Sequence, residues 1–374
     1  MIKKILKYAK NLIILIIGVG SIYLVNLFFM KPYSIDHFLG KELVMGLVDS
    51  PEALTYIGIF DRFNWLTKHN SKLSIPEDDL ENDIKELEDS IKTLYKYDDS
   101  SLSETQIITK KIAIFDFENN LKELKEFPYL DYPLNQIGGI HLNTIEFMSD
   151  MHPIRTKSEA EDYIKRADLI KDVYEGVLKD LEKQADSGIF PPEFVYEHVI
   201  GQLNKFIEYS HEEHPLYTQF MKKVYELDIT EDEVNNFNNE IKRAIDESVT
   251  PGFELLMQFM IRTEKNANKN HGIWSQPNGD EYYKLRIRTY TTTDYSPEDI
   301  HQMGLDEVER ISNRMREILT DLGYDKSKSV GELMNELNES PQFLYDDTPD
   351  RKEIIVNDYM EMVNEAIEVM TDYF

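Results

Sequence analysis

The chain has 374 residues, of which 41% are hydrophobic and 30% charged, and its formal net charge is −29. These values are typical of a folded protein with a large core, and they exclude an intrinsically disordered chain. Residues 1–31 contain five Lys and no acidic residue, which leaves 36 basic against 70 acidic residues, a net charge of −34, for the rest. Such an acidic body as a whole repels nucleic acid and anionic lipid, so we expect no nucleic-acid partner.

The N-terminal segment has the pattern of a membrane anchor. Lys-rich residues 1–10 precede an uncharged run from Asn11 to Met30, and about 20 apolar residues are enough to cross a bilayer as a helix. The end of the run, NLFFMKP, has no cleavage motif of small residues. The sequence therefore predicts a signal anchor over residues 1–31 that crosses the membrane through residues 11–30, with a cytoplasmic N-terminus and an extracytoplasmic body. The alternative is a protein that is secreted after cleavage of this segment.

The remainder, residues 34–374, has helical patterning almost throughout, so we expect a mainly α fold. Ser50 before Pro51 and Ser296 before Pro297 are typical of helix starts, and Gly188 is typical of a helix end. Apolar residues at three- and four-residue spacing predict helices over 76–96, 103–126, 157–187, 191–207, 216–226, 230–247, 251–269, 297–322 and 347–374.

Two segments depart from this pattern. Residues 127–155 contain three Pro and a Gly-Gly pair, which predict loops or short turns and a natural wall for a cleft. His141 and His152 lie in this segment; either could face a cleft, although a simple surface position is the commoner role of a loop histidine. Residues 282–292 follow the turn sequence Pro-Asn-Gly and are rich in aromatic and β-branched residues, which favours a short strand or a β-hairpin.

The stretch His211-Glu212-Glu213-His214 is close to a zinc-protease motif. In that motif three residues separate the two His, so that both imidazoles lie on one helix face with a Glu base between them. Here only two residues separate them, and Pro215 moves His214 away from helical backbone angles. We therefore expect a charged surface turn and no zinc site here.

Other catalytic signatures are absent or weak. Glu-x-x-His, which builds di-metal sites in helix bundles, occurs at Glu208/His211 and at Glu298/His301. Two such pairs are close to what composition alone produces, so ordinary helix faces are the preferred interpretation. The sequence has no G-x-S-x-G elbow, P-loop or dinucleotide fingerprint, and the lack of Cys excludes a thiolate nucleophile or metal ligand and a lipidated Cys.

Three blocks together resemble a known bacterial family, the one catalogued as domain of unknown function 885. They are YPLNQIGGIHLNTIEFMSDMHPI, GIFPPEFVYEHVIGQL and, longest and most specific, GIWSQPNGDEYYKLRIRTYTTTDYSPEDIHQMGLDEVERI. The resemblance runs from about Ser34 to the end. It implies a helical gluzincin-like peptidase fold with a deep cleft, a zinc-binding H-E-x-x-H helix with a further Glu ligand, and activity on short peptides.

The chain departs from this family pattern at one decisive point. In the family the H-E-x-x-H helix lies downstream of the third block, and here the sequence ends at Phe374 before such a motif. The resemblance thus covers the N-terminal portion of the family's domain, so we expect the helical domain to be incomplete at its C-terminus. No metal ligand or catalytic Glu is implied for any residue present, and zinc is expected only if the missing part is supplied.

What the resemblance implies for this chain is a substrate cleft along the third block. Its candidate residues are Trp274, Asn278, Asp280, Tyr283, Thr292 and His301. Each also has a structural alternative, in packing, helix capping or a buried hydrogen bond.

Two functional hypotheses follow. In the first, the protein is a membrane-anchored relative of zinc metallopeptidases that is inactive as it stands, or is completed by a second chain. In the second, it is a non-catalytic helical surface module that binds peptides or a partner protein. Loss of activity on chelation separates the two, because peptide binding without a metal does not respond to a chelator.

Overall fold

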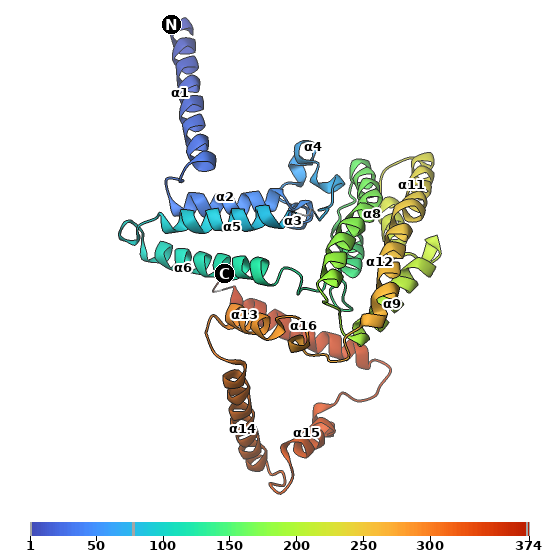
Figure 1. Ribbon diagram of the computed structural model, residues 1–374. Helices are drawn as coiled ribbons and strands as arrows, with labels where there is room; N and C mark the ends of the chain where they lie inside the picture. Colours follow the sequence, from blue (N-terminus) through green and yellow to red (C-terminus); the bar gives the residue numbers. More distant parts are fainter. Residues whose placement is uncertain (1, 77–78, 372, 374) are drawn as a thin grey trace. The chain divides into compact units, whose positions relative to one another are not determined.

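The computed structural model describes residues 2–76, 79–371 and 373, and the chain divides into two compact units, Met1–Thr293 and Asp294–Phe374 (Figure 1). Among these described residues the regular elements are helices, and the one β-type pairing is an isolated bridge between Pro192 and Asn268. The expectation of a mainly α fold is confirmed. The two units are described separately below.

The first unit begins with the long apolar helix α1 (Ile2–Phe29). Within it, Lys10–Phe29 is long and apolar enough to cross a membrane, and it is the one such segment among the described residues. The turn that follows is fixed by Asn26, whose side-chain amide donates to the carbonyl of Lys31 (2.9 Å) and whose side-chain oxygen accepts from the backbone N–H of Tyr33 (3.0 Å). The hydroxyl of Tyr97 donates to the carbonyl of Pro32 (2.8 Å). The exit of α1 is therefore tied to the helical body.

Three helices form a layer next to α1: α2 (Ile35–Val48), α5 (Leu80–Tyr95) and α6 (Glu104–Glu126). Figure 1 shows them stacked side by side. Side-chain caps set their starts, since Ser34 accepts from a backbone N–H of α2 and Ser103 forms a reciprocal capping box with Gln106 at the start of α6. Their shared core contains Ile35, Phe38, Leu94 and Tyr97.

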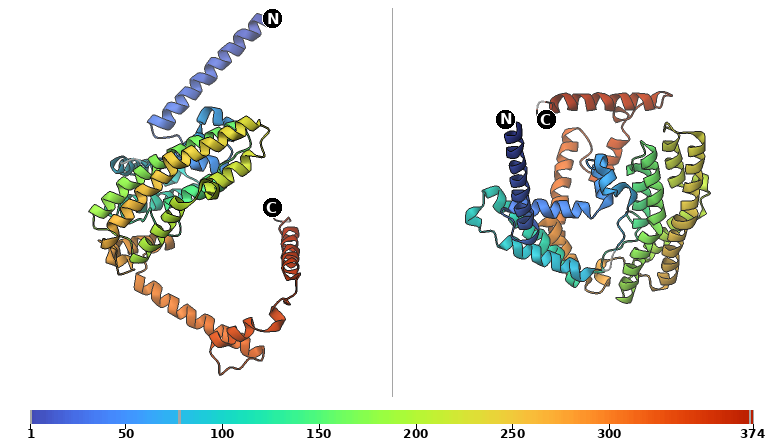
Figure 2. Two further views of the ribbon diagram at one scale, coloured as in Figure 1. Left: turned by 90° about the vertical axis from the view of Figure 1, so that its right-hand side faces the viewer. Right: turned by 90° about the horizontal axis from the view of Figure 1, so that it is seen from above.

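The largest core lies in a second group of helices, which pack around α8 (Lys157–Asp186). The others are α9 (Glu193–Glu208), α10 (Pro215–Val224), α11 (Glu231–Ala244) and α12 (Thr250–Thr263). Figure 2 shows α8, α9, α11 and α12 running alongside one another. Gly252 permits close contact, because a Cβ there would lie 2.9 Å from Cδ2 of Tyr174 on α8. Gly188, with φ of 75°, follows the end of α8, so the expected helix end is confirmed.

The second unit contains α14 (Pro297–Asp321), α15 (Val330–Asn338) and α16 (Arg351–Met370). Ser296 begins α14 through a capping box with Asp299, and Pro297 occupies the first helical position, as the sequence predicts. None of the described residues of α16 is buried, although the helix carries apolar side chains along its length. Its apolar side chains are therefore exposed within the second unit.

The strand or hairpin expected over residues 282–292 is wrong. The segment is the helix α13 (Gly279–Thr291), which follows Asn278 in a left-handed conformation. A Cβ at Gly279 would lie 1.8 Å from the carbonyl oxygen of Ile273, so only glycine fits where the helix begins. Burial of Leu285 and Ile287 holds the helix against the unit, and this packing overrides the strand preference of the threonines.

The expectation of loops over residues 127–155 is only partly correct. The segment contains α7 (Ile140–Glu146), which continues into a π-helical turn, Phe147–Met151. Both histidines of the segment are buried: Nε2 of His141 contacts the side-chain oxygen of Gln202 (2.9 Å), and His152 lies in the polar network described below. Neither is a surface or cleft-facing group.

Candidate functional site

An open groove of the first unit lies between α2, α6 and the end of α13. It encloses about 660 Å³. Its walls are mainly apolar: Leu39, Leu43 and Leu47 from α2, and Ile112, Ala113, Phe115 and Phe117 from α6. We call it the α2/α6 groove. A concave apolar surface of this size is suited to apolar side chains of a ligand.

Two of the groove's apolar side chains are largely exposed even though they lie in regular helices. Leu43 is 64% exposed and Ile112 is 63% exposed. The charged groups in the lining are the carboxylates of Glu42 and Asp116. Glu42 is partly neutralised by Lys41 (2.7 Å) and accepts a hydrogen bond from Ser90 (3.0 Å). The lining of the groove is thus mainly apolar and contains two carboxylates.

The third wall of the groove contains Thr289 and Thr292, at the C-terminal end of α13. Thr292 has φ of 55°, a left-handed conformation that a β-branched residue rarely adopts. Its hydroxyl donates to the carbonyl of Thr291 (2.7 Å). Nearby, the guanidinium of Arg288 lies over the ring of Phe115 at 5.1 Å and joins α13 to α6. A strained residue held in place by such packing is the kind of position where function is often found.

Of the six candidate residues from the sequence, Thr292 is the one that lines this groove. Trp274 lies in the short helix Ile273–Ser275, Asn278 precedes α13, and Asp280 and Tyr283 lie in its first turns; all four are exposed on the first unit. His301 is exposed on α14 in the second unit. A role of these residues in substrate contact stays a prediction.

The near-motif His211–His214 divides into two residues with different surroundings. His211 is at the surface, where Nε2 contacts a carboxylate oxygen of Asp246 (2.7 Å). His214 is buried, and Nδ1 accepts a hydrogen bond from the N–H of Leu216 (3.2 Å), which caps α10. Burial lowers the pKa of His214 to about 4, so its imidazole is neutral. The imidazoles of His211 and His214 therefore do not point toward a shared position where a metal ion could bind.

The Glu-x-x-His pairs also fail to form part of a metal site. Glu208 ends α9 and His211 lies beyond it, whereas Glu298 and His301 lie in the first turns of α14. Within the part of the chain that the structure describes, no group of three or more His, Cys, Asp or Glu side chains could hold a metal ion. The residues described do not fit a zinc site.

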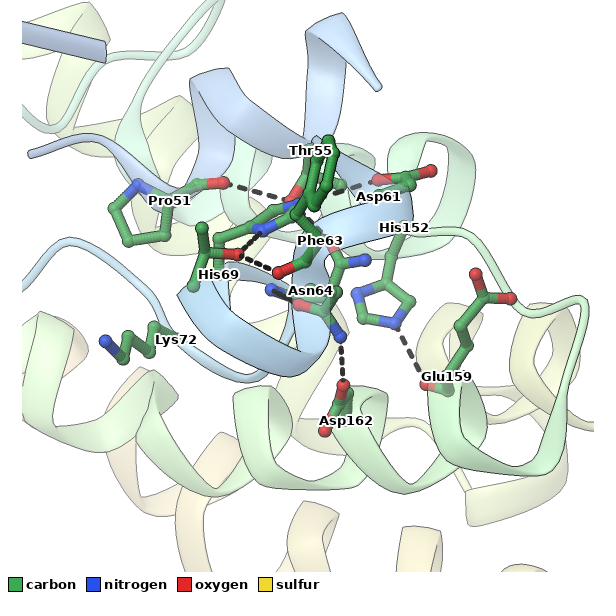
Figure 3. A network of polar contacts seen from close by, with 12 residues as sticks. Pro51, Thr55, Asp61, Phe63, Asn64, His69, Lys72, His152, Glu159 and Asp162 are labelled. Carbon is green, nitrogen blue, oxygen red and sulfur yellow. Dashed lines mark hydrogen bonds and ion pairs between the residues drawn. The ribbon is translucent and has the colours of Figure 1, made fainter. Parts of the chain in front are cut away.

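A polar network centred on buried Arg166 of α8 was missed in the sequence (Figure 3). It connects α8 with α3 (Pro51–Ile57) and with the short helices that follow, including α4 (Asn64–Thr67). Arg166 donates to the hydroxyl of Thr55 (2.6 Å), to the carbonyls of His69 (2.8 Å) and Lys72 (2.8 Å), and to Nδ1 of His152 (2.8 Å). Burial lowers the pKa of Arg166 to about 10, which leaves the guanidinium charged at neutral pH.

The network has one sequence signal, which the structure makes clear. Arg166 occupies a helix position between Tyr163 and Ile170, three residues before and four after, which are both buried. It therefore lies on the apolar face of α8, where an Arg must find partners. The groove had a similar signal, because α6 carries isoleucines at 108 and 112 that do not belong to its buried face.

The comparisons with known proteins place this helical chain in one family. The profile of a family of bacterial proteins of unknown function, DUF885, matches residues 51–374. The chain therefore belongs to the DUF885 family, as its resemblance indicated. No curated protein matches it.

Two solved structures share the fold. One is a candidate lipoprotein from Colwellia psychrerythraea, 25% identical, with a TM-score of 0.72 over 87% of this chain and 58% of that protein. The other is a candidate lipoprotein of unknown function from Shewanella oneidensis, 13% identical, with a TM-score of 0.61 over 91% of this chain and 57% of that protein. The chain thus spans less than two thirds of the length of either structure. The second likeness concerns the fold alone.

Proposed function

We propose that the protein is a membrane-anchored, extracytoplasmic peptide-binding module. Its helix α1 crosses the membrane, with the N-terminus in the cytoplasm, and its helical body binds peptide segments with apolar side chains in the α2/α6 groove. The observation that carries the proposal is the groove itself: its lining is mainly apolar, and its residues Leu43 and Ile112 are largely exposed. Exposed apolar surface inside a concavity is typical of a binding site.

Charge indicates which peptides fit. The two carboxylates in the lining, Glu42 and Asp116, belong to a body that carries a large excess of acidic residues. Such a field attracts cationic ligands and repels anionic ones. The expected ligand is a short peptide with an apolar centre and basic residues at its ends.

Anchoring is supported by two observations. Lys10–Phe29 forms an uninterrupted apolar helix, and Lys residues precede it, which favours a cytoplasmic N-terminus. The two structural relatives are candidate lipoproteins, a class attached to membranes. This sequence has no Cys to carry a lipid, so an apolar helix is the attachment that it offers.

The proposal is tested with the full chain in lipid nanodiscs. Binding of two fluorescent hexapeptides is measured by anisotropy, one with Lys and one with Glu on either side of the same four Leu and Phe residues. We expect the Lys peptide to bind with a Kd in the micromolar range and the Glu peptide to bind at least about ten-fold more weakly. Nanodiscs without protein measure binding to lipid.

Two variants connect binding to the groove. Leu43→Lys and Ile112→Lys place a charge in the apolar lining of the groove. Each is expected to raise the Kd of the Lys peptide by about ten-fold or more. Ile137→Lys is the matched control, since Ile137 is exposed but lies outside the groove. Equal affinity of all three variants and the unaltered chain would show that the groove does not bind the peptide.

A second candidate function is peptide hydrolysis completed by a second chain. It is favoured by the unburied apolar surface of α16. The described residues provide no group of three metal ligands, so this candidate places the zinc ligands outside them. Peptidase activity that appears only with a co-purified partner and is lost on chelation supports this candidate; peptide binding that is indifferent to chelation supports the first.

A further inference from the structure

Residues 59–68 form a surface segment whose apolar side chains are exposed to solvent. Trp65 is 74% exposed and Leu66 is 68% exposed, and Ile59 and Phe63 of the same segment are also exposed. We call this segment, which includes α4, the aromatic tip. An exposed cluster of Trp, Leu, Ile and Phe is unfavourable in water and indicates that something covers it.

The tip differs from the rest of the body in its charge. The tip contains two basic residues, Arg62 and Lys68, which are both exposed, and one acidic residue, Asp61. The carboxylate of Asp61 is paired with Arg155 at 2.6 Å. The tip is therefore a cationic, aromatic surface on a strongly acidic protein, and its charge complements an anionic one.

Hydrogen bonds on the side facing α8 hold the backbone of the tip, and Figure 3 shows the one between Asn64 and Asp162. The side-chain amide of Asn64 donates to the carboxylate of Asp162 on α8 (2.9 Å), and its side-chain oxygen accepts from the N–H of Asn70 (3.0 Å). Arg166 binds the carbonyl of His69 at 2.8 Å. All these contacts lie on the inner side, so the network fixes the backbone while Trp65 and Leu66 stay turned away from the core.

The tip lies on the side of the first unit from which α1 leaves. Figures 1 and 2 both show α4 on this side, whereas α13 lies on the opposite side. The exit of α1 is fixed by Asn26 and Tyr97, as described above. A bilayer crossed by α1 therefore faces the tip.

We propose that the aromatic tip is a second membrane contact of this protein. Trp65, Leu66 and Phe63 insert into the interfacial region of the bilayer that α1 crosses, and Arg62 and Lys68 bind anionic phospholipid headgroups. Trp is enriched at this depth because its ring has an apolar body and a polar N–H. The inference rests on the membrane anchoring in the proposed function. Two attachment points fix the orientation of the body above the membrane.

The two Trp residues of the chain provide the test. The full-length chain is reconstituted into vesicles of phosphatidylcholine and phosphatidylglycerol, with or without lipids brominated close to the headgroup. Trp274→Phe leaves Trp65 as the single fluorophore, and we expect bromolipids to reduce its emission by about two-fold. Trp65→Phe leaves Trp274, which is 63% exposed and directly precedes α13 on the far side, and its emission is expected to stay unchanged.

A further variant and a separate assay distinguish the possible failures. Leu66→Glu in the Trp274→Phe background changes an exposed residue and is expected to restore most of the lost emission. Flotation of the vesicles after an alkaline wash shows which chains are inserted in the membrane. The inference is overturned if Trp65 in those chains is not quenched, or if Trp65 and Trp274 are quenched equally. Failure to float with the vesicles overturns the anchoring in the proposed function instead.

Discussion

Nη1 of Arg166 donates a hydrogen bond to Nδ1 of His152 over 2.8 Å, and both side chains are buried. The guanidinium has only donors, so Nδ1 is an acceptor, and the ring proton lies on Nε2, which contacts the carbonyl of Glu159 at 3.1 Å. The imidazole is therefore neutral. Burial, together with the charge of Arg166, lowers the pKa of His152 to about 3.

Arg166→Met is expected to destabilise the protein strongly. Methionine fills similar space but leaves the carbonyls of His69 and Lys72, the hydroxyl of Thr55 and Nδ1 of His152 without their donor. Each buried unpaired group costs about 1–3 kcal/mol, so the free energy of unfolding should fall by at least about 3 kcal/mol. Urea unfolding of the full chain in detergent, followed by circular dichroism, measures it.

Arg262→Met is the matched control for this substitution. Arg262 is exposed and pairs with Glu182 at the surface, so its loss should cost less than about 1 kcal/mol. A similar cost for the two variants would contradict the central role assigned to Arg166.

Stability should fall with acidification before the carboxylates titrate. His152, His214, His141 and His69 all have pKa values that burial lowers in the folded state. The unfolded chain binds protons at these residues below about pH 6.5, whereas the folded chain does not. The free energy of unfolding is therefore highest above that pH. Below it, each group lowers the free energy of unfolding by up to about 1.4 kcal/mol per pH unit. Urea midpoints measured between about pH 7 and pH 5 check this, because carboxylates protonate mainly at lower pH. A constant midpoint in this window would refute it.

Gly252→Ala should destabilise the helix bundle although alanine favours helices. Its Cβ would lie 2.9 Å from Cδ2 of Tyr174 and 3.3 Å from Cα of Lys171, so α12 must move away from α8. We expect a loss of about 1–3 kcal/mol in the free energy of unfolding. Gly201→Ala on α9 has no atom within 4 Å of the new Cβ and should gain about 0.5–1 kcal/mol. Thermal unfolding of the two variants should therefore shift in opposite directions.

His214→Ala and His211→Ala should have unequal effects. His214 caps α10 and packs beside the rings of Phe206 and Tyr209, so its loss is expected to cost about 2 kcal/mol. His211 forms an exposed pair with Asp246, which contributes less than about 1 kcal/mol. Urea unfolding near neutral pH measures both, and equal costs would mean that the two histidines act as a unit.

Much of the fold could be predicted from local chemistry. Ser50, Ser103 and Ser296 cap helices where the sequence has a Ser followed by helix-forming residues, and Gly188 ends one, because these signals act within a single turn. The segment around Leu285 could not be predicted, since its threonines favour a strand and only burial against distant residues makes it helical.

The candidate site was largely beyond sequence reasoning. Thr292 was named and does line the α2/α6 groove, but the other walls come from Leu43 and Ile112, which are far away in sequence. Nothing in a helical pattern tells whether an apolar residue on its second face meets another helix or borders a groove. The location of a concavity follows from how helices pack, which no single helix encodes.

Arg166 forms hydrogen bonds with residues far earlier in the sequence, and this separation affects the order of folding. His69 is joined to Arg166 across 97 residues, and Thr55 across 111. During synthesis the segment that carries Trp65 is complete long before Arg166 is made, so until then it lacks these hydrogen bonds. A chain whose synthesis stops before residue 166 should therefore expose the apolar side chains of this segment to chaperones and proteases. The new protein is most susceptible to both in the time between the synthesis of this segment and that of residue 166.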